Sequence, residues 1–206
     1  MVPVLERSPA HCPFWAVEPG ELLIVVPRLP TPEKVGAVVW ALIERSVTDD
    51  DLSTAVANAA EAIETHLTSS DEDYAPGGLR VTAGDVVIDP GCCVGLDEWR
   101  YWLDALDGRP VYLGHDPDVW LEDRGAVLRL RRDEDQFLPG ELADQPGQYI
   151  DIPRDALPGL LEGVRQDLAG FLVALHQWAH DLVPEMADHL VLTVDRRLRV
   201  SAPLDG

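Results

Sequence analysis

The sequence has very little positive charge. Its 206 residues include 37 Asp and Glu residues but only 16 Lys and Arg residues, so the formal net charge is −21 at pH 7. The phosphate backbone of a nucleic acid and the surface of an anionic membrane repel such a protein, and we expect neither as a partner. A basic protein would instead be steered towards it, which makes a basic protein the expected partner.

Cysteine and long apolar runs are scarce as well. Three cysteines, two of them adjacent, do not form the disulfide framework of a small secreted domain. Apolar runs such as residues 22–26 are far shorter than the roughly 20 residues that cross a bilayer. The first residues lack the basic segment and apolar stretch of a signal peptide. We therefore predict a cytoplasmic protein without a membrane partner.

Strand-like and helix-like patterns alternate irregularly, which predicts a single α+β domain over residues 1–206. We expect a mainly antiparallel β-sheet packed by several α-helices, because short apolar runs are separated by turn residues. Residues 1–20 carry four prolines, Pro3, Pro9, Pro13 and Pro19, and predict an irregular N-terminal arm. Strands are expected at residues 22–26, 79–81, 86–88, 111–113, 119–121, 126–130 and 149–152.

Helices are expected where apolar residues recur every three or four positions. Thr31 is the predicted N-cap of a helix that reaches about residue 46, and Gly108 is expected to end a helix over residues 96–106. A further helix should run from the acidic residues 49–51 to about residue 67. A long amphipathic helix is predicted over residues 157–182, with Pro184 interrupting it. Residues 69–78 and 133–147 are expected to form acidic loops.

Cys92 and Cys93 lie between Gly91 and Gly95, just before a predicted helix. A thiol at a helix N-terminus can serve as a nucleophile, a redox sensor or a soft-metal ligand. Nearby acidic residues oppose the thiolate form. The favoured interpretation is that two small residues fill a crowded, buried corner, with the reactive roles as alternatives.

His176 and His180 are one helical turn apart, as are the two histidines of the H-E-x-x-H zinc proteases. Gln177 occupies the position of the glutamate that acts as general base, and an amide cannot take a proton from zinc-bound water. We therefore interpret both histidines as residues at the solvent edge of the helix, with a metal site as the alternative.

His115, Asp116 and Asp118 follow a predicted strand and could form a general base or a metal site. Asp-Pro also starts turns for backbone reasons alone, and the turn is the favoured interpretation. Asp133, Glu134 and Asp135 lack the ligand spacing of a calcium loop and are interpreted as a solvated or recognition surface. Trp99 and Trp102 share one helix face and indicate core packing, whereas a partly exposed cluster that included Trp120 would suit an interface.

Residues 84–130, with the segments 90–96 and 113–117, and residues 152–178 together cover about a third of the chain. In these segments the sequence resembles a group of actinobacterial proteins that have no established activity. The resemblance therefore implies no catalytic residue. Small acidic α+β proteins of such bacteria are sometimes similar to immunity proteins that neutralise a toxin, and this similarity is one of class only.

The sequence contains no complete catalytic set, so the leading hypothesis is a non-enzymatic interaction module. It would be an immunity-type or regulatory protein that binds a basic partner and needs no cofactor. A Cys- and His-dependent enzyme or metal-binding protein is the first alternative. A nucleic-acid mimic, which would occupy the groove of a DNA-binding protein, is the second.

Overall fold

Seven strands form two antiparallel sheets in the computed structural model, which describes residues 1–8, 11–47, 58–68, 74–133 and 149–204. The first sheet has the order β2-β1-β3-β4, formed by β1 (Val2–Glu6), β2 (Leu23–Val25), β3 (Gly77–Ala83) and β4 (Val86–Ile88). The second has the order β5-β6-β7, formed by β5 (Val119–Asp123), β6 (Val127–Arg132) and β7 (Tyr149–Pro153).

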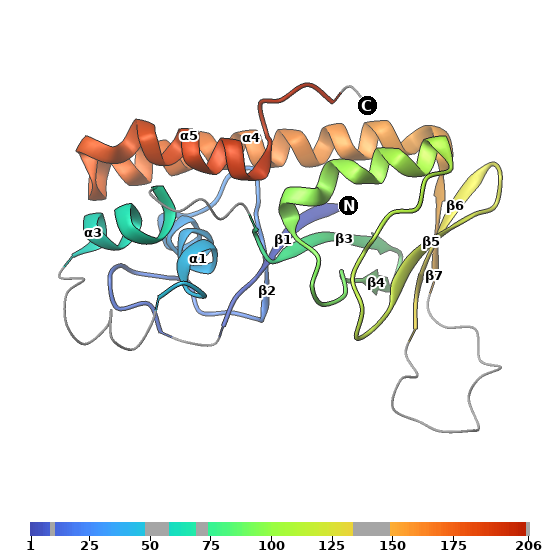
Figure 1. Ribbon diagram of the computed structural model, residues 1–206, viewed down its shortest axis with the longest axis horizontal. Coiled ribbons are helices and arrows are strands. Elements are labelled where there is room, and N and C mark those ends of the chain that lie inside the picture. Colours follow the sequence, from blue (N-terminus) through green and yellow to red (C-terminus); the bar gives the residue numbers. More distant parts are fainter. Residues whose placement is uncertain (9–10, 48–57, 69–73, 134–148, 205–206) are drawn as a thin grey trace.

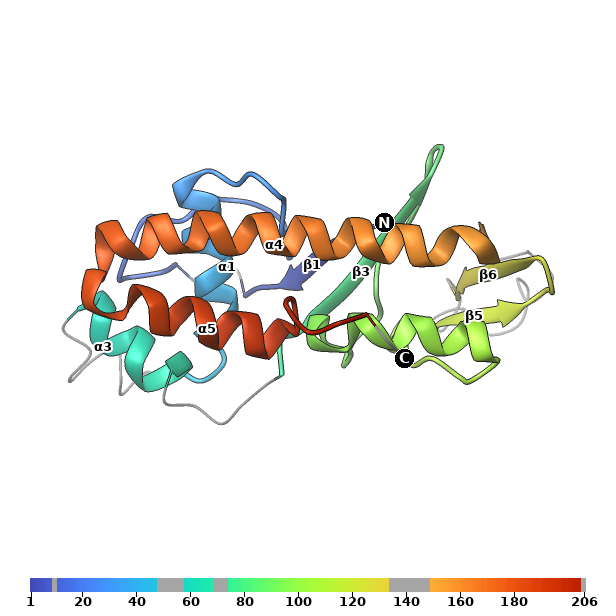
Figure 2. The same cartoon turned by 90° about the horizontal axis from the view of Figure 1, so that it is seen from above.

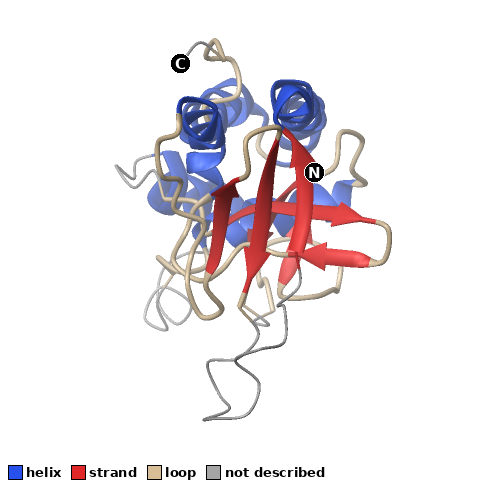
Figure 3. Ribbon diagram, turned by 90° about the vertical axis from the view of Figure 1, so that its right-hand side faces the viewer, coloured by secondary structure: helices blue, strands red, loops and turns tan. Residues whose placement is uncertain are grey.

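The helices lie mainly on one side of these strands (Figure 1). They are α1 (Pro32–Ile43), α3 (Ala59–Ile63) with its π-helical continuation η1 (Glu64–Thr68), the 3-10 helix η2 (Leu96–Asp107), the single turn η3 (Arg154–Ala156), α4 (Leu157–Leu182), the single turn η4 (Pro184–Met186) and α5 (Ala187–Leu198). Seen from above, α5 and η2 both lie alongside α4 (Figure 2). In the view along the molecule, helices seen nearly end-on lie above the strands (Figure 3). The predicted α+β single domain is confirmed.

The helix boundaries follow the signals in the sequence. The side-chain oxygen of Thr31 accepts a hydrogen bond from the backbone N–H of Lys34 at 3.2 Å, as an N-cap does. Gly108 ends η2 with a φ of 71°. The apolar stripe of α4 is buried from Leu157 to Ala179, and Pro184 separates α4 from α5 as predicted. The amphipathic periodicity of the sequence thus correctly predicts α4, the longest helix among the described residues.

The prediction of an irregular arm over residues 1–20 is wrong at its start, because β1 is a central strand. It pairs with β2 on one side and with β3 on the other, and Val4 and Leu5 are completely buried. Pro3 fits because only its N–H donor is missing, while its carbonyl accepts a hydrogen bond from the N–H of Val26 at 2.9 Å. The burial of Val4 and Leu5 thus stabilises a strand that Pro3 by itself would disfavour.

Other differences concern short segments. Within the described residues 74–133, residues 111–113 form no strand, although the carbonyl of Leu113 accepts a hydrogen bond from Gly91 at 2.9 Å. The expected helix start at residues 49–51 lies outside the described residues, as do residues 69–73 of the first acidic loop and residues 134–147 of the second. In the part of the chain that is described, no helix combines the length and apolar character needed to cross a membrane.

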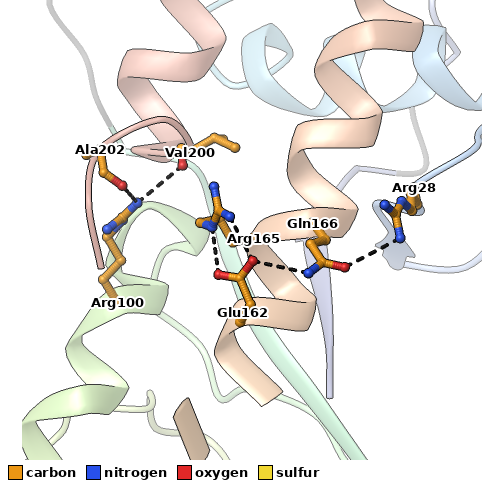
Figure 4. A network of polar contacts seen from close by, with 7 residues as sticks. All are labelled: Arg28, Arg100, Glu162, Arg165, Gln166, Val200 and Ala202. Carbon is orange, nitrogen blue, oxygen red and sulfur yellow. Dashed lines mark hydrogen bonds and ion pairs between the residues drawn. The ribbon is translucent and has the colours of Figure 1, made fainter. Parts of the chain in front are cut away.

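Polar contacts fix the C-terminal segment against η2 and order the surface of α4 (Figure 4). Arg100 donates to the carbonyls of Val200, at 3.3 Å, and of Ala202. On α4, the Arg165 guanidinium and the Gln166 amide hold the pKa of the Glu162 carboxyl down at about 2. Trp99 adds a buried hydrogen bond of 2.8 Å from its ring N–H to the carbonyl of Leu198.

Candidate functional site

Two places in the structure have the character of a site. The first, here named the tryptophan groove, is a cavity of about 460 Å³ between the N-terminal segment, the start of α1 and the second half of α4. Its walls include Trp15, Glu33, Gln177, Trp178, Asp181 and Leu182. Its size is that of a pocket for a small ligand or for a large side chain of a partner.

The tryptophans of the groove are positioned by the close contact of the Trp15 segment with α1 and by the packing of their rings. Trp15 lies against Gly36 of α1, where an added Cβ would come within 2.4 Å of the Ala16 carbonyl oxygen. The ring N–H of Trp15 donates to the Gly36 carbonyl at 2.9 Å. The rings of Trp15 and Trp178 meet edge to face with their centroids 5.5 Å apart. The segment around Trp15 is thus irregular but firmly docked.

The charge around the groove is negative. Glu33 and Asp181 are the charged residues among the described residues that line it, and Lys34 next to Glu33 is paired with Glu18 at 3.2 Å. Asp181 is largely exposed, accepts a hydrogen bond from the Gln177 amide at 3.2 Å and lies 3.9 Å from Nδ1 of His180. An aromatic cavity with carboxylates and no lining Lys or Arg favours a cation over an anion.

The second place is here named the Cys–His corner and consists of Cys92, Cys93 and His115. The backbones of Cys92 and His115 exchange hydrogen bonds, with N–H to carbonyl distances of 2.6 and 3.1 Å. This pairing is possible because Gly91 and Gly114 are in direct backbone contact, and a Cβ on either would come within 2.6 Å of the other. Two glycines far apart in the sequence therefore bring the three side chains together.

The ligand atoms of the corner are close and accessible. One atom from each residue, the two sulfurs and a ring nitrogen, lie within 4.8 Å of one another. The two sulfurs are 2.7 Å apart, and Nδ1 of His115 is 2.8 Å from Oδ2 of Asp116. Both cysteines are exposed, so the prediction that they fill a buried corner is wrong.

The environment of Cys92 favours its neutral thiol. The hydrogen bond between the Cys92 and Cys93 sulfurs is the main cause that raises the pKa of the Cys92 thiol, followed by desolvation and nearby negative groups. A cysteine nucleophile is usually activated by a lowered pKa, so this arrangement does not resemble an activated catalytic thiol. The chemistry that the corner offers is a set of three ligand atoms for a thiophilic ion.

The remaining predicted site residues are not among those that line the groove or form the corner. Trp99 and Trp102 belong to the core, as predicted, whereas Trp120 on β5 is partly exposed. His176 and His180 are exposed, and Nε2 of His176 lies 3.0 Å from Asp188. Asp118 lies on the surface, and its carbonyl accepts a hydrogen bond from Asp133 at 2.9 Å. Glu134 and Asp135 are outside the described residues.

Sequence reasoning missed the groove and the closeness of its two tryptophans. Trp15 lies in a proline-rich segment. Trp178 lies between His176 and His180, which were the predicted site residues of this helix. Their contact spans most of the chain and has no local signal. Comparisons with protein-family models, with curated proteins and with solved structures find no match to this chain.

Proposed function

We propose that the protein is a non-enzymatic interaction module that binds a basic protein partner in the tryptophan groove. The observation that carries this proposal is an aromatic cavity edged by carboxylates in a chain of net charge −21. In the same proposal the partner contributes an arginine side chain, and the complex forms in the cytoplasm. An immunity-type or regulatory protein would act in this way.

Arginine suits the groove for chemical reasons. A guanidinium interacts favourably with the faces of aromatic rings and pairs with carboxylates, and it is more weakly hydrated than an ammonium. Trp15 and Trp178 supply the rings, and Glu33 and Asp181 supply the carboxylates. Cation–π contacts contribute about 0.5–2 kcal/mol each, so one arginine can account for a clear preference over a neutral side chain.

The surroundings of the groove support a protein partner over a free small cation. Three large apolar side chains from the segments that form it are exposed: Leu29 at 89%, Val173 at 74% and Leu182 at 38%. Exposed apolar side chains beside an aromatic pocket are typical of a binding surface. There one side chain of the partner occupies the pocket, and the surrounding apolar contacts exclude water from it. The −21 charge disfavours nucleic acid as the ligand.

The proposal is tested with two peptides that differ in one group. An arginine-containing hexapeptide and the same peptide with citrulline, which keeps the shape but loses the charge, are titrated against the full chain by tryptophan fluorescence. We expect the arginine peptide to bind at least about tenfold more tightly, since one charge-assisted contact is worth about 1.5–3 kcal/mol. Its affinity should fall with salt, because exposed charges are screened beyond about 8 Å at physiological ionic strength.

Matched variants locate the binding. Trp178→Ala and the double variant Glu33→Gln/Asp181→Asn should each remove the preference for arginine. Trp120→Ala, which removes a partly exposed tryptophan outside the groove, should keep it. Equal affinities for the two peptides, or equal losses in Trp178→Ala and Trp120→Ala, would show that the groove does not recognise a cationic side chain.

A further inference from the structure

We propose that the Cys–His corner binds a zinc ion, with the Cys92 and Cys93 sulfurs and the His115 imidazole as its three protein ligands. The proposal is independent of the tryptophan groove, which is formed by other segments. It rests on three ligand atoms from two separate segments that lie within 4.8 Å of one another on the surface. Thiolate and imidazole are the ligands that zinc prefers.

The distances allow a metal centre after a small adjustment. Zinc–sulfur bonds of about 2.3 Å and zinc–nitrogen bonds of about 2.0–2.1 Å in tetrahedral geometry require ligand atoms about 3.5–3.8 Å apart. The sulfurs are now 2.7 Å apart and all three atoms lie within 4.8 Å. Each therefore needs to move by only about 1 Å, which exposed side chains achieve by small χ rotations.

Asp116 prepares the histidine for this role. Its Oδ2 lies 2.8 Å from Nδ1 of His115, and an Nδ1–H that donates to this carboxylate leaves the lone pair of Nε2 for a metal. Zinc-binding histidines commonly have such a carboxylate on the other ring nitrogen, because it fixes the ring and strengthens the ligand. The corner thus has both the ligands and the support that a zinc site uses.

The backbone beneath the corner restricts its geometry. Cys92 and His115 are joined by two backbone hydrogen bonds, and Gly91 and Gly114 touch below them. Side chains carried on such a fixed frame lose little freedom when they bind an ion, which favours affinity. Three protein ligands leave a fourth position for water or for a group from a partner, as in exchangeable and catalytic zinc sites.

The experiment measures zinc binding to the reduced full chain in competition with a chromophoric chelator. We expect one zinc per chain in the wild type. Cys92→Ser and Cys93→Gly should each weaken binding by more than about 100-fold, and Asp116→Asn by about 10–100-fold, the range for loss of a supporting carboxylate. Cys93 has a φ of 67°, where glycine is favoured, so Cys93→Gly removes the thiol without disturbing the loop.

His176 provides the matched control, since like the partly exposed His115 it is paired with a carboxylate, at 3.0 Å from Asp188. His176→Gln should leave zinc affinity unchanged, whereas His115→Gln should lower it more than Asp116→Asn does. Circular dichroism establishes that each variant is folded. The proposal is overturned if no 1:1 complex forms, if the two cysteine variants retain wild-type affinity, or if His176→Gln loses as much affinity as His115→Gln.

Discussion

The tryptophan groove and the Cys–His corner are held in position in opposite ways. In the groove, side chains fix one another: Trp15 packs on Trp178 and Trp40, and its ring N–H is bonded to Gly36. In the corner, the backbone fixes the geometry through the Gly91–Gly114 contact, and the functional side chains project outwards. The groove therefore depends on packing, and the corner depends on two glycines.

This difference has consequences for sensitivity to mutation. Side chains of the corner can be exchanged without loss of the fold, because they are exposed and bury little apolar surface. Side chains near the groove belong to the core or border on it, so their exchange affects both stability and binding. The three cysteines of the chain test this contrast directly, since Cys12 lies in the packed region and the other two lie in the corner.

The largest expected effect is on thiol reactivity. In the metal-free native protein, Cys92 and Cys93 should react with a thiol reagent at least about a thousandfold faster than Cys12, since a domain stability of about 5–15 kcal/mol limits access to a buried group. Cys12 is only 2% exposed, and burial also raises the pKa of its thiol. Both properties suppress the reactive thiolate, and the rate is measured by quenched labelling and mass spectrometry.

A pH series adds a second measurement at Cys12. The pKa of the Cys12 thiol is raised in the folded protein. The contribution of this thiol to the free energy of unfolding is therefore full below the ordinary thiol pKa, and it is lost as the pH rises through the raised pKa of the folded state. Cys12→Ala should remove this alkaline loss, whereas the double variant Cys92→Ser/Cys93→Ser should keep it. Labelling of Cys12 at the rate of Cys92 would show that the N-terminal segment is not packed as the structure has it.

The sequence predicts the elements better than it predicts the sites. The apolar stripe of α4, the Thr31 cap, the β3–β4 and β5–β6 hairpins and the Gly108 terminus all have local causes and are found where expected. β1 was missed because one proline obscured a short apolar strand whose pairing with β3 is long-range. Local signals cannot show which distant segment completes a sheet.

The sites depend on long-range contacts in the same way. Cys92, Cys93, His115 and Asp116 were each recognised as candidates, but no sequence pattern joins position 92 to position 115. What joins them is the contact of two glycines, and a lone glycine in a sequence usually indicates only a turn. The expected burial of the cysteines is wrong as well, and the close packing at this place is that of the Gly91 and Gly114 backbones.

The next effect in size tests the glycine contact. Gly114→Ala should lower the free energy of unfolding by about 3 kcal/mol, because a methyl group is forced into backbone and a residue other than glycine is strained at this positive φ. The added Cβ would lie 2.5 Å from the backbone carbon of Gly91, and φ at Gly114 is 94°. Zinc binding should be lost together with stability. Urea unfolding measures the change.

Gly163→Ala is the matched control for this variant. Gly163 lies within α4, and an added Cβ there would meet no atom within 4 Å. Alanine should stabilise the protein by about 0.8–1.0 kcal/mol, the difference in helix propensity between the two residues. If Gly114→Ala is as stable as wild type, the two glycines do not hold the corner together and the contrast with the groove is lost.

The smallest expected effect distinguishes the two adjacent cysteines. Cys93 has a φ of 67°, and Cys92 is not among the described residues with a positive φ. A left-handed conformation costs a residue other than glycine about 1–2 kcal/mol, and glycine adds about 0.5–1 kcal/mol of backbone entropy to the unfolded chain. Cys93→Gly should therefore stabilise the protein by about 0.5–1 kcal/mol, whereas Cys92→Gly should destabilise it by a similar amount. Urea unfolding of the two variants in the presence of reductant and chelator measures the difference. Equal destabilisation by both would mean that Cys93 is not held in the left-handed conformation, and that the corner is less restrained by its backbone than the glycine contact implies.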